Sequence, residues 1–150
     1  MIRRFRREVA AARLPAGPPP GGPVTEADLR PLPPAAGAWL RAAGGLGRPR
    51  DQSFRARLRM RFRAAPGARW QRAEALQYTL GWPEIARIFH MRLRLRGVPV
   101  HGRDTYLRGA GRLRIRPLDL LTVRDLGGPE MDLGELVTWL NDAVLLAPSM

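Results

Sequence analysis

The chain of 150 residues contains no cysteine and no lysine. The absence of cysteine excludes disulfides, thiolate metal sites and thiol nucleophiles. The only serines, Ser53 and Ser149, lie outside any Gly-x-Ser-x-Gly turn, so a serine triad is not expected. No apolar run approaches the roughly 20 residues that a membrane-spanning helix needs, and the basic N-terminus is not followed by the apolar region of a signal peptide. We therefore expect a cytoplasmic protein.

All 26 basic residues are arginine, and the formal net charge is +13. The charge is unevenly distributed, because residues 51–116 carry sixteen arginines against four acidic residues, whereas residues 117–150 carry one against six. A positive field in the middle of the chain favours anionic partners such as nucleic acid or acidic lipid. Pairing between the two oppositely charged parts is equally allowed.

The middle of the chain predicts an antiparallel sheet. In residues 54–63 apolar residues alternate with arginine without a break, which as a strand sends the two kinds of side chain to opposite faces. Similar alternations occur in residues 89–96 and 112–116. With further strands at 69–80, 100–107 and 118–126, we predict a six-stranded meander with one apolar and one arginine face.

The ends of the chain predict helices. Residues 1–23 combine a basic helix with a Pro/Gly-rich linker at 15–23. Ile2, Phe5 and Val9 share one helical face, a pattern typical of docking on an anionic membrane or a partner, but a solvated terminal helix is the simpler interpretation. Residues 24–150 are expected to form one domain with short helices at 25–29 and 34–43. Its closing helix is expected to be capped by Asp132. The helix would turn an apolar stripe to the sheet, formed by Leu133, Leu136, Val137, Leu140 and Val144. Its acidic residues Glu130, Asp132, Glu135 and Asp142 would then face solvent.

The predicted fold class is therefore α+β. We expect a curved antiparallel sheet, a meander or partial barrel, with N-terminal helices and with the helix after the last strand packed on the apolar face.

One short segment, residues 101–106, concentrates polar side chains. In a strand, His101 and Asp104 point to opposite faces, whereas Asp104 and Tyr106 share one. A structural role is favoured, in which Asp104 accepts hydrogen bonds from an arginine of a neighbouring strand; acid/base catalysis by Asp104 and Tyr106 is the alternative. Gly109 and Gly111 are interpreted as a bulge or bend. The chain has only two histidines, and we expect no metal or cofactor.

Several ordered motifs give the chain a family resemblance. They are Leu32-Pro33-Pro34, residues 73–78, residues 100–111, Gly128-Pro129-Glu130, Gly134-Glu135-Leu136, Trp139-Leu140 and Ala147-Pro148. From about residue 24 onward the chain resembles a bacterial family catalogued as domain of unknown function 6544. That family is similar in outline to lipoprotein-carrier (LolA-like) half-barrels.

The resemblance implies that the chain is the front portion of a longer domain, incomplete at its C-terminus. It also implies a ligand-binding role for residues of the family motifs, namely Gln77, Tyr78, Arg103, Asp104, Tyr106, Gly109 and Gly111.

The first functional hypothesis is a non-enzymatic module that binds a lipid-like apolar ligand or a protein partner. The alternative is an arginine face that binds nucleic acid or an acidic membrane, through Arg55, Arg57, Arg59, Arg61, Arg92, Arg94, Arg112 and Arg114. No aromatic residue shares the arginine register of the three clean strands, which argues against base stacking and favours a solvated face. An enzyme that uses Asp104 and Tyr106 is the second alternative.

Overall fold

A computed structural model of the chain describes residues 1–14, 21–63 and 65–150. Six strands form one antiparallel sheet in the order of the sequence: β1 (Ser53–Phe62), β2 (Gln71–Leu80), β3 (Ala86–Leu95), β4 (Val98–Leu107), β5 (Ala110–Pro117) and β6 (Arg124–Gly127). The helices are α1 (Ile2–Ala11), α2 (Glu26–Leu29), α3 (Pro34–Ala42) and α4 (Pro129–Leu146). The predicted α+β meander is confirmed, while most of the predicted linker, residues 15–20, lies outside the described residues.

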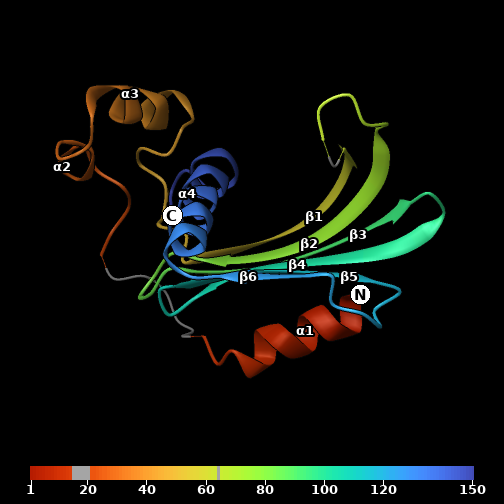
Figure 1. Cartoon of the computed structure of the whole chain (residues 1–150). Coiled ribbons are helices and arrows are strands. Elements are labelled where there is room, and N and C mark those ends of the chain that lie inside the picture. The colour runs from red at the N-terminus through yellow and green to blue at the C-terminus, as the bar shows by residue number, and fades with distance from the viewer. Residues whose placement is uncertain (15–20, 64) are drawn as a thin grey trace.

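The sheet is strongly curved and carries a helix on each side. Figure 1 shows α4 above the inner, concave face and α1 beneath the outer, convex face. The alternation of β1 sets the two faces as predicted: its odd-numbered arginines from Arg55 to Arg61 are exposed on the convex face, and the even-numbered residues from Phe54 to Phe62 are half-buried on the concave face.

The last strand is shorter than predicted. Only Arg124–Gly127 pairs with β5, rather than the whole segment from Leu118 to Leu126. Leu118 and Asp119 adopt positive φ angles of 54° and 60°, and the Leu118 amide donates to the Pro99 carbonyl at 2.8 Å. This turn takes the chain out of an extended conformation before it can form a ladder.

Helix α1 packs on the convex face. Phe5 is buried there against Leu76 and Ile88, and Val9 and Tyr78 pack around this cluster. The expectation of a solvated helix was wrong. Side chains alternate between the two faces along a strand, and this alternation puts the apolar side chains of Leu76 and Ile88 on the convex face among the arginines, where α1 packs on them.

The concave face has an apolar floor at the end of the sheet away from α4. Ala73, Leu93 and Val100 are buried there. Their partly buried neighbours are Met60, Phe62, Met91, Leu95 and Ile115.

Helix α4 lies on the concave face as predicted, but it is rotated about its axis. Glu135 is only 5% exposed, whereas Leu133, Val137 and Leu140 are 64%, 48% and 53% exposed. The prediction that the apolar stripe faces the sheet and the acids face solvent was therefore wrong for these residues. The sheet side of the helix meets an arginine, Arg87, and the ion pairs to that residue set the rotation.

The start of α4 explains why β5 has a glycine at position 111. The helix begins at Pro129, and Asp132 accepts a hydrogen bond from the Gly111 amide at 2.7 Å instead of capping the helix. A Cβ atom at Gly111 would collide with the Met131 carbonyl, so only glycine permits this approach. The register through Gly111 is unbroken, so the predicted bulge is absent; Gly109, at φ 81°, belongs to the preceding turn.

Candidate ligand-binding site on the concave face

An arginine lies on the concave face beneath α4, near the start of β3. Arg87 of β3 donates from Nη1 to Glu135 Oε2 at 3.0 Å and from Nε to Asp142 Oδ2 at 2.9 Å. Gln77 of β2 also donates to Asp142, at 2.8 Å, and to Thr79 at 2.9 Å. We call these residues, together with Asp104 of β4, the concave polar cluster.

The cluster is largely removed from solvent. The side chains of Arg87 and Glu135 are 5% and 6% exposed, and that of Asp142 is 25% exposed. The guanidinium of Arg87 lies 4.7 Å from the centre of the Phe89 ring, which supports it from the sheet. The fold thus encloses the cluster between α4 and the sheet, and only Asp142 and Asp104 are partly open to solvent.

Two carboxyl groups of the cluster resist ionisation. Burial raises the pKa of Glu135 to about 7, and the nearby Asp104 adds to this effect, while Arg87 opposes it. Burial also raises the pKa of Asp104, again against the attraction of Arg87. Among the described residues, the buried Asp104 Oδ1 has no hydrogen-bond partner. Three carboxyl groups therefore share one guanidinium, and one of their oxygens is unsatisfied.

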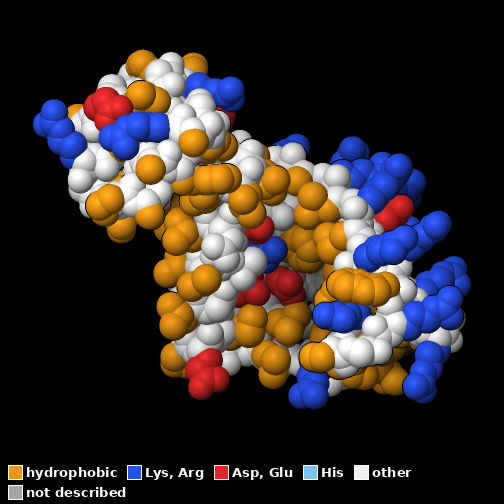
Figure 2. All heavy atoms as spheres, turned by 90° about the horizontal axis from the view of Figure 1, so that it is seen from above, with side chains coloured by type: hydrophobic (Ala, Val, Ile, Leu, Met, Phe, Trp, Pro, Cys, Tyr) orange, Lys and Arg blue, Asp and Glu red, His pale blue; other side chains and the backbone are white. Residues whose placement is uncertain are grey.

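A hollow opens over the cluster. Figure 2 looks onto the concave face and shows acidic and basic side chains at the bottom of a depression between α4 and the raised end of the sheet, with apolar side chains beside them. The apolar floor of Leu93, Met60 and Met91 continues from this point along the strands. The arrangement combines polar acceptors at one end with hydrocarbon at the other.

The structure divides the residues of the predicted ligand set. Gln77 and Asp104 belong to the concave polar cluster, and Tyr106 lies on the same face, in register with Arg87. Among the described residues, Asp104 accepts no hydrogen bond from an arginine, contrary to the structural role predicted for it, because Arg87 donates to the two acids of α4 instead.

Tyr78 and Arg103 lie on the opposite, convex face. Arg103 pairs there with Glu8 of α1, and Arg55 stacks over Tyr78 with its guanidinium 5.4 Å from the ring centre. Gly109 and Gly111 serve the turn and the approach of α4 described above.

Four residues of the cluster were not predicted from the sequence as site residues: Thr79, Arg87, Glu135 and Asp142. A signal for the last three existed. Arg87 is two residues before Phe89 in the same strand, so its side chain falls on the same, concave face. Glu135 and Asp142 are seven residues apart, which puts both on one side of a helix.

The convex face is partly neutralised by acids. Asp125 accepts from both Arg112 and Arg114, Glu74 lies 3.5 Å from Arg92, and Glu8 pairs with Arg103. Glu8 also contacts the fully buried His90 at 2.7 Å. Binding of this face to nucleic acid or an acidic membrane stays a prediction, as does catalysis by Asp104 and Tyr106.

Comparison with known proteins places this site in a family. The family model described as "Family of unknown function (DUF6544)" matches residues 22–150, which include the whole sheet and α4. The chain belongs to this family. No curated protein and no solved structure matches it, so the similarity to lipoprotein carriers stays a prediction. Within the described part of this DUF6544 chain, no helix is long and apolar enough to cross a membrane, and no three metal-ligating side chains are grouped to hold a metal ion.

Proposed function

We propose that the concave face binds an amphipathic ligand with an apolar chain and a positively charged, hydrogen-bond-donating head group such as an amine. The observation that carries the proposal is the excess of carboxyl groups: Glu135 and Asp142 pair with a single guanidinium, that of Arg87, and Asp104 lies near it. The apolar floor lies beside this cluster. A cationic head group would supply the missing charge and satisfy the free oxygen of Asp104.

The energetics favour a functional role for the cluster over a purely structural one. Burying a charge costs several kcal/mol per ion after relaxation, and a buried ion pair rarely stabilises more than well-packed apolar side chains. Helix α4 possesses an apolar stripe that could fill this space, yet Leu133, Val137 and Leu140 point to solvent while the acids point inward. Perturbed carboxyl groups in a hollow are typical of binding and catalytic sites.

The chain of the ligand would lie along the apolar floor. Met60, Phe62, Met91 and Leu95 are only partly buried by their neighbours, so a hydrocarbon chain can remove further apolar surface from water. Unbranched methionine side chains adapt to a chain of variable shape.

The test is a calorimetric titration with decylamine, decanol and decanoate, which share one chain and differ in head group. Decylamine should bind most tightly. Asp104→Asn should weaken decylamine binding by at least about tenfold, since a hydrogen bond to a charged group contributes about 1.5–3 kcal/mol. Asp125→Asn is the matched control, because this carboxylate is paired with arginines on the convex face. Equal affinity for decylamine and decanol, or equal losses in the two variants, would contradict the proposal.

A further inference from the structure

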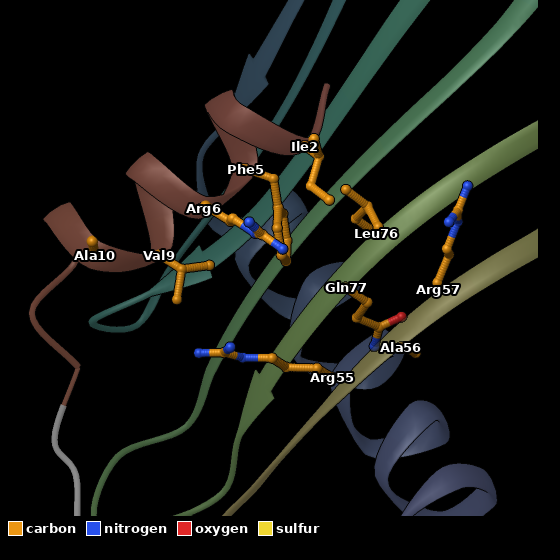
Figure 3. Close-up of a pocket in the computed structure, with 10 residues that line it drawn as sticks. All are labelled: Ile2, Phe5, Arg6, Val9, Ala10, Arg55, Ala56, Arg57, Leu76 and Gln77. Atoms are coloured by element: carbon orange, nitrogen blue, oxygen red, sulfur yellow. The ribbon is translucent and has the colours of Figure 1, made fainter.

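A second cleft lies on the convex face, between α1 and the strands β1 and β2. Its volume is about 590 Å³, within the range of roughly 300–1,000 Å³ that small-molecule sites occupy. Figure 3 shows the side chains that line it, among them Ile2, Phe5, Arg6 and Val9 from α1, and Arg55, Arg57 and Leu76 from the strands.

The inner walls of this cleft are apolar. Phe5 and Leu76 are buried at 7% and 8% exposure where helix and sheet meet. Ile2 is 49% exposed and Val9 is half-buried, so the apolar side of α1 continues beyond the contact with the sheet. A hydrocarbon chain inserted between α1 and β2 would cover these side chains and remove them from water.

The outer part of the cleft is cationic. Arg6, Arg55 and Arg57 are exposed, no acidic residue lines the cleft, and none of these three arginines takes part in an ion pair among the described residues. In Figure 3 the Arg55 side chain extends from β1 toward Val9 on α1.

Part of the positive charge of the convex face is already neutralised by acids. Arg103, Arg112 and Arg114 are all paired with carboxylates. Glu8, the single acid of α1, is held by His90 and Arg103 on the β3–β4 part of the sheet. At the cleft, by contrast, positive charge without a partner carboxylate among the described residues lies directly beside apolar side chains.

We propose that this cleft binds a monomeric anionic amphiphile, with its acyl or alkyl chain between α1 and β2 and its carboxylate or phosphate head group among Arg6, Arg55 and Arg57. Arginine suits such a head group because its guanidinium forms paired hydrogen bonds with both anions. The site is on the opposite side of the sheet from the concave polar cluster and does not depend on the function proposed for that cluster. Most of its apolar wall comes from α1, which precedes the family match at residues 22–150.

The proposal is tested by titrating the full chain with decanoate, in parallel with decylamine and decanol. Decanoate should bind one-to-one, more tightly than decanol, and more weakly as salt is added, because salt screens the exposed guanidinium groups. The double variant Arg55→Gln/Arg57→Gln should weaken decanoate binding at least tenfold and leave decylamine binding unchanged.

The matched control is Arg59→Gln/Arg61→Gln, which removes the same charge from the same face and strand but outside the cleft. It should weaken decanoate binding far less than Arg55→Gln/Arg57→Gln does, because Arg59 and Arg61 do not line the cleft and so do not hydrogen-bond to a head group held there. Equal losses in the two double variants would overturn the proposal, because they would indicate only a general positive field. A second variant, Val9→Gln, should weaken decanoate without altering its salt dependence.

A last comparison shows whether the anionic head group belongs to a single molecule or to a membrane surface. Vesicles of phosphatidylglycerol are compared with monomeric decanoate in the same buffer. Binding to vesicles alone, with no binding of decanoate, would overturn the proposal in favour of a membrane surface. Loss of decylamine binding in Asp104→Asn with intact decanoate binding would separate this cleft from the concave site.

Discussion

Replacing Glu135 by glutamine should remove much of the pH dependence of stability between mildly acidic and neutral conditions. Burial raises the pKa of Glu135 from 4.5 to about 7 in the folded chain. The folded state therefore binds this proton more tightly than the unfolded state, and stability is lost as the pH rises from about 4.5 to about 7. A shift of about 2.5 pKa units corresponds to about 3 kcal/mol at 1.36 kcal/mol per unit. Glutamine has no proton to lose, so this contribution disappears in the variant.

The assay is urea unfolding of the parent chain and of Glu135→Gln at a series of pH values from about 5 to about 8. The two should have similar stability at the acidic end, and the variant should become the more stable by up to about 3 kcal/mol at the alkaline end. Glu130→Gln, an exposed position in the first turn of the same helix, is the control and should follow the parent chain. Parallel curves for Glu135→Gln and the parent chain would refute the reasoning.

Two further substitutions test other contacts of the fold. Gly111→Ala should destabilise the chain by about 1–3 kcal/mol in thermal or urea unfolding, because the added methyl group meets the Met131 carbonyl; Gly134→Ala, which meets nothing, should stabilise it by up to about 1 kcal/mol. Glu8→Gln should make the free energy of unfolding depend less on pH at acidic pH. Although burial opposes ionisation of Glu8, hydrogen bonds from His90 and Arg103 hold its pKa at about 2, so the parent chain should lose roughly 3 kcal/mol as the pH falls from about 4.5 to about 2. A parent chain no more acid-sensitive than the variant would contradict the role of this contact.

The strands were predictable because their sequence alternates with a period of two, and residues 54–63 do so without interruption. The same alternation could have predicted where α1 packs, since it places the side chains of Leu76 and Ile88 on the convex face. It was missed because β2 and the start of β3 mix polar and apolar residues on both faces. Packing of a helix on the arginine side depends on a small apolar patch that composition alone does not reveal.

The rotation of α4 was not predicted because the hydrophobic stripe was assumed to determine the buried side of the helix. Arg87 on the concave face reverses that preference by pairing with Glu135 and Asp142. The need for glycine at position 111 could not be predicted either, because it arises where α4 crosses β5, a contact between segments that the sequence does not show to be adjacent.

The orientation of α4 is the claim on which the concave site depends, and cysteine labelling tests it most directly. The chain has no cysteine, so single substitutions report one position each. In the folded protein, Leu133→Cys and Val137→Cys should react with a thiol reagent at rates close to those in urea, whereas Ala143→Cys, at a position only 7% exposed, should react slowly until the chain unfolds. Slow labelling at 133 and 137 with fast labelling at 143 would contradict the account, because the acids of α4 would then face solvent and the concave polar cluster would not exist.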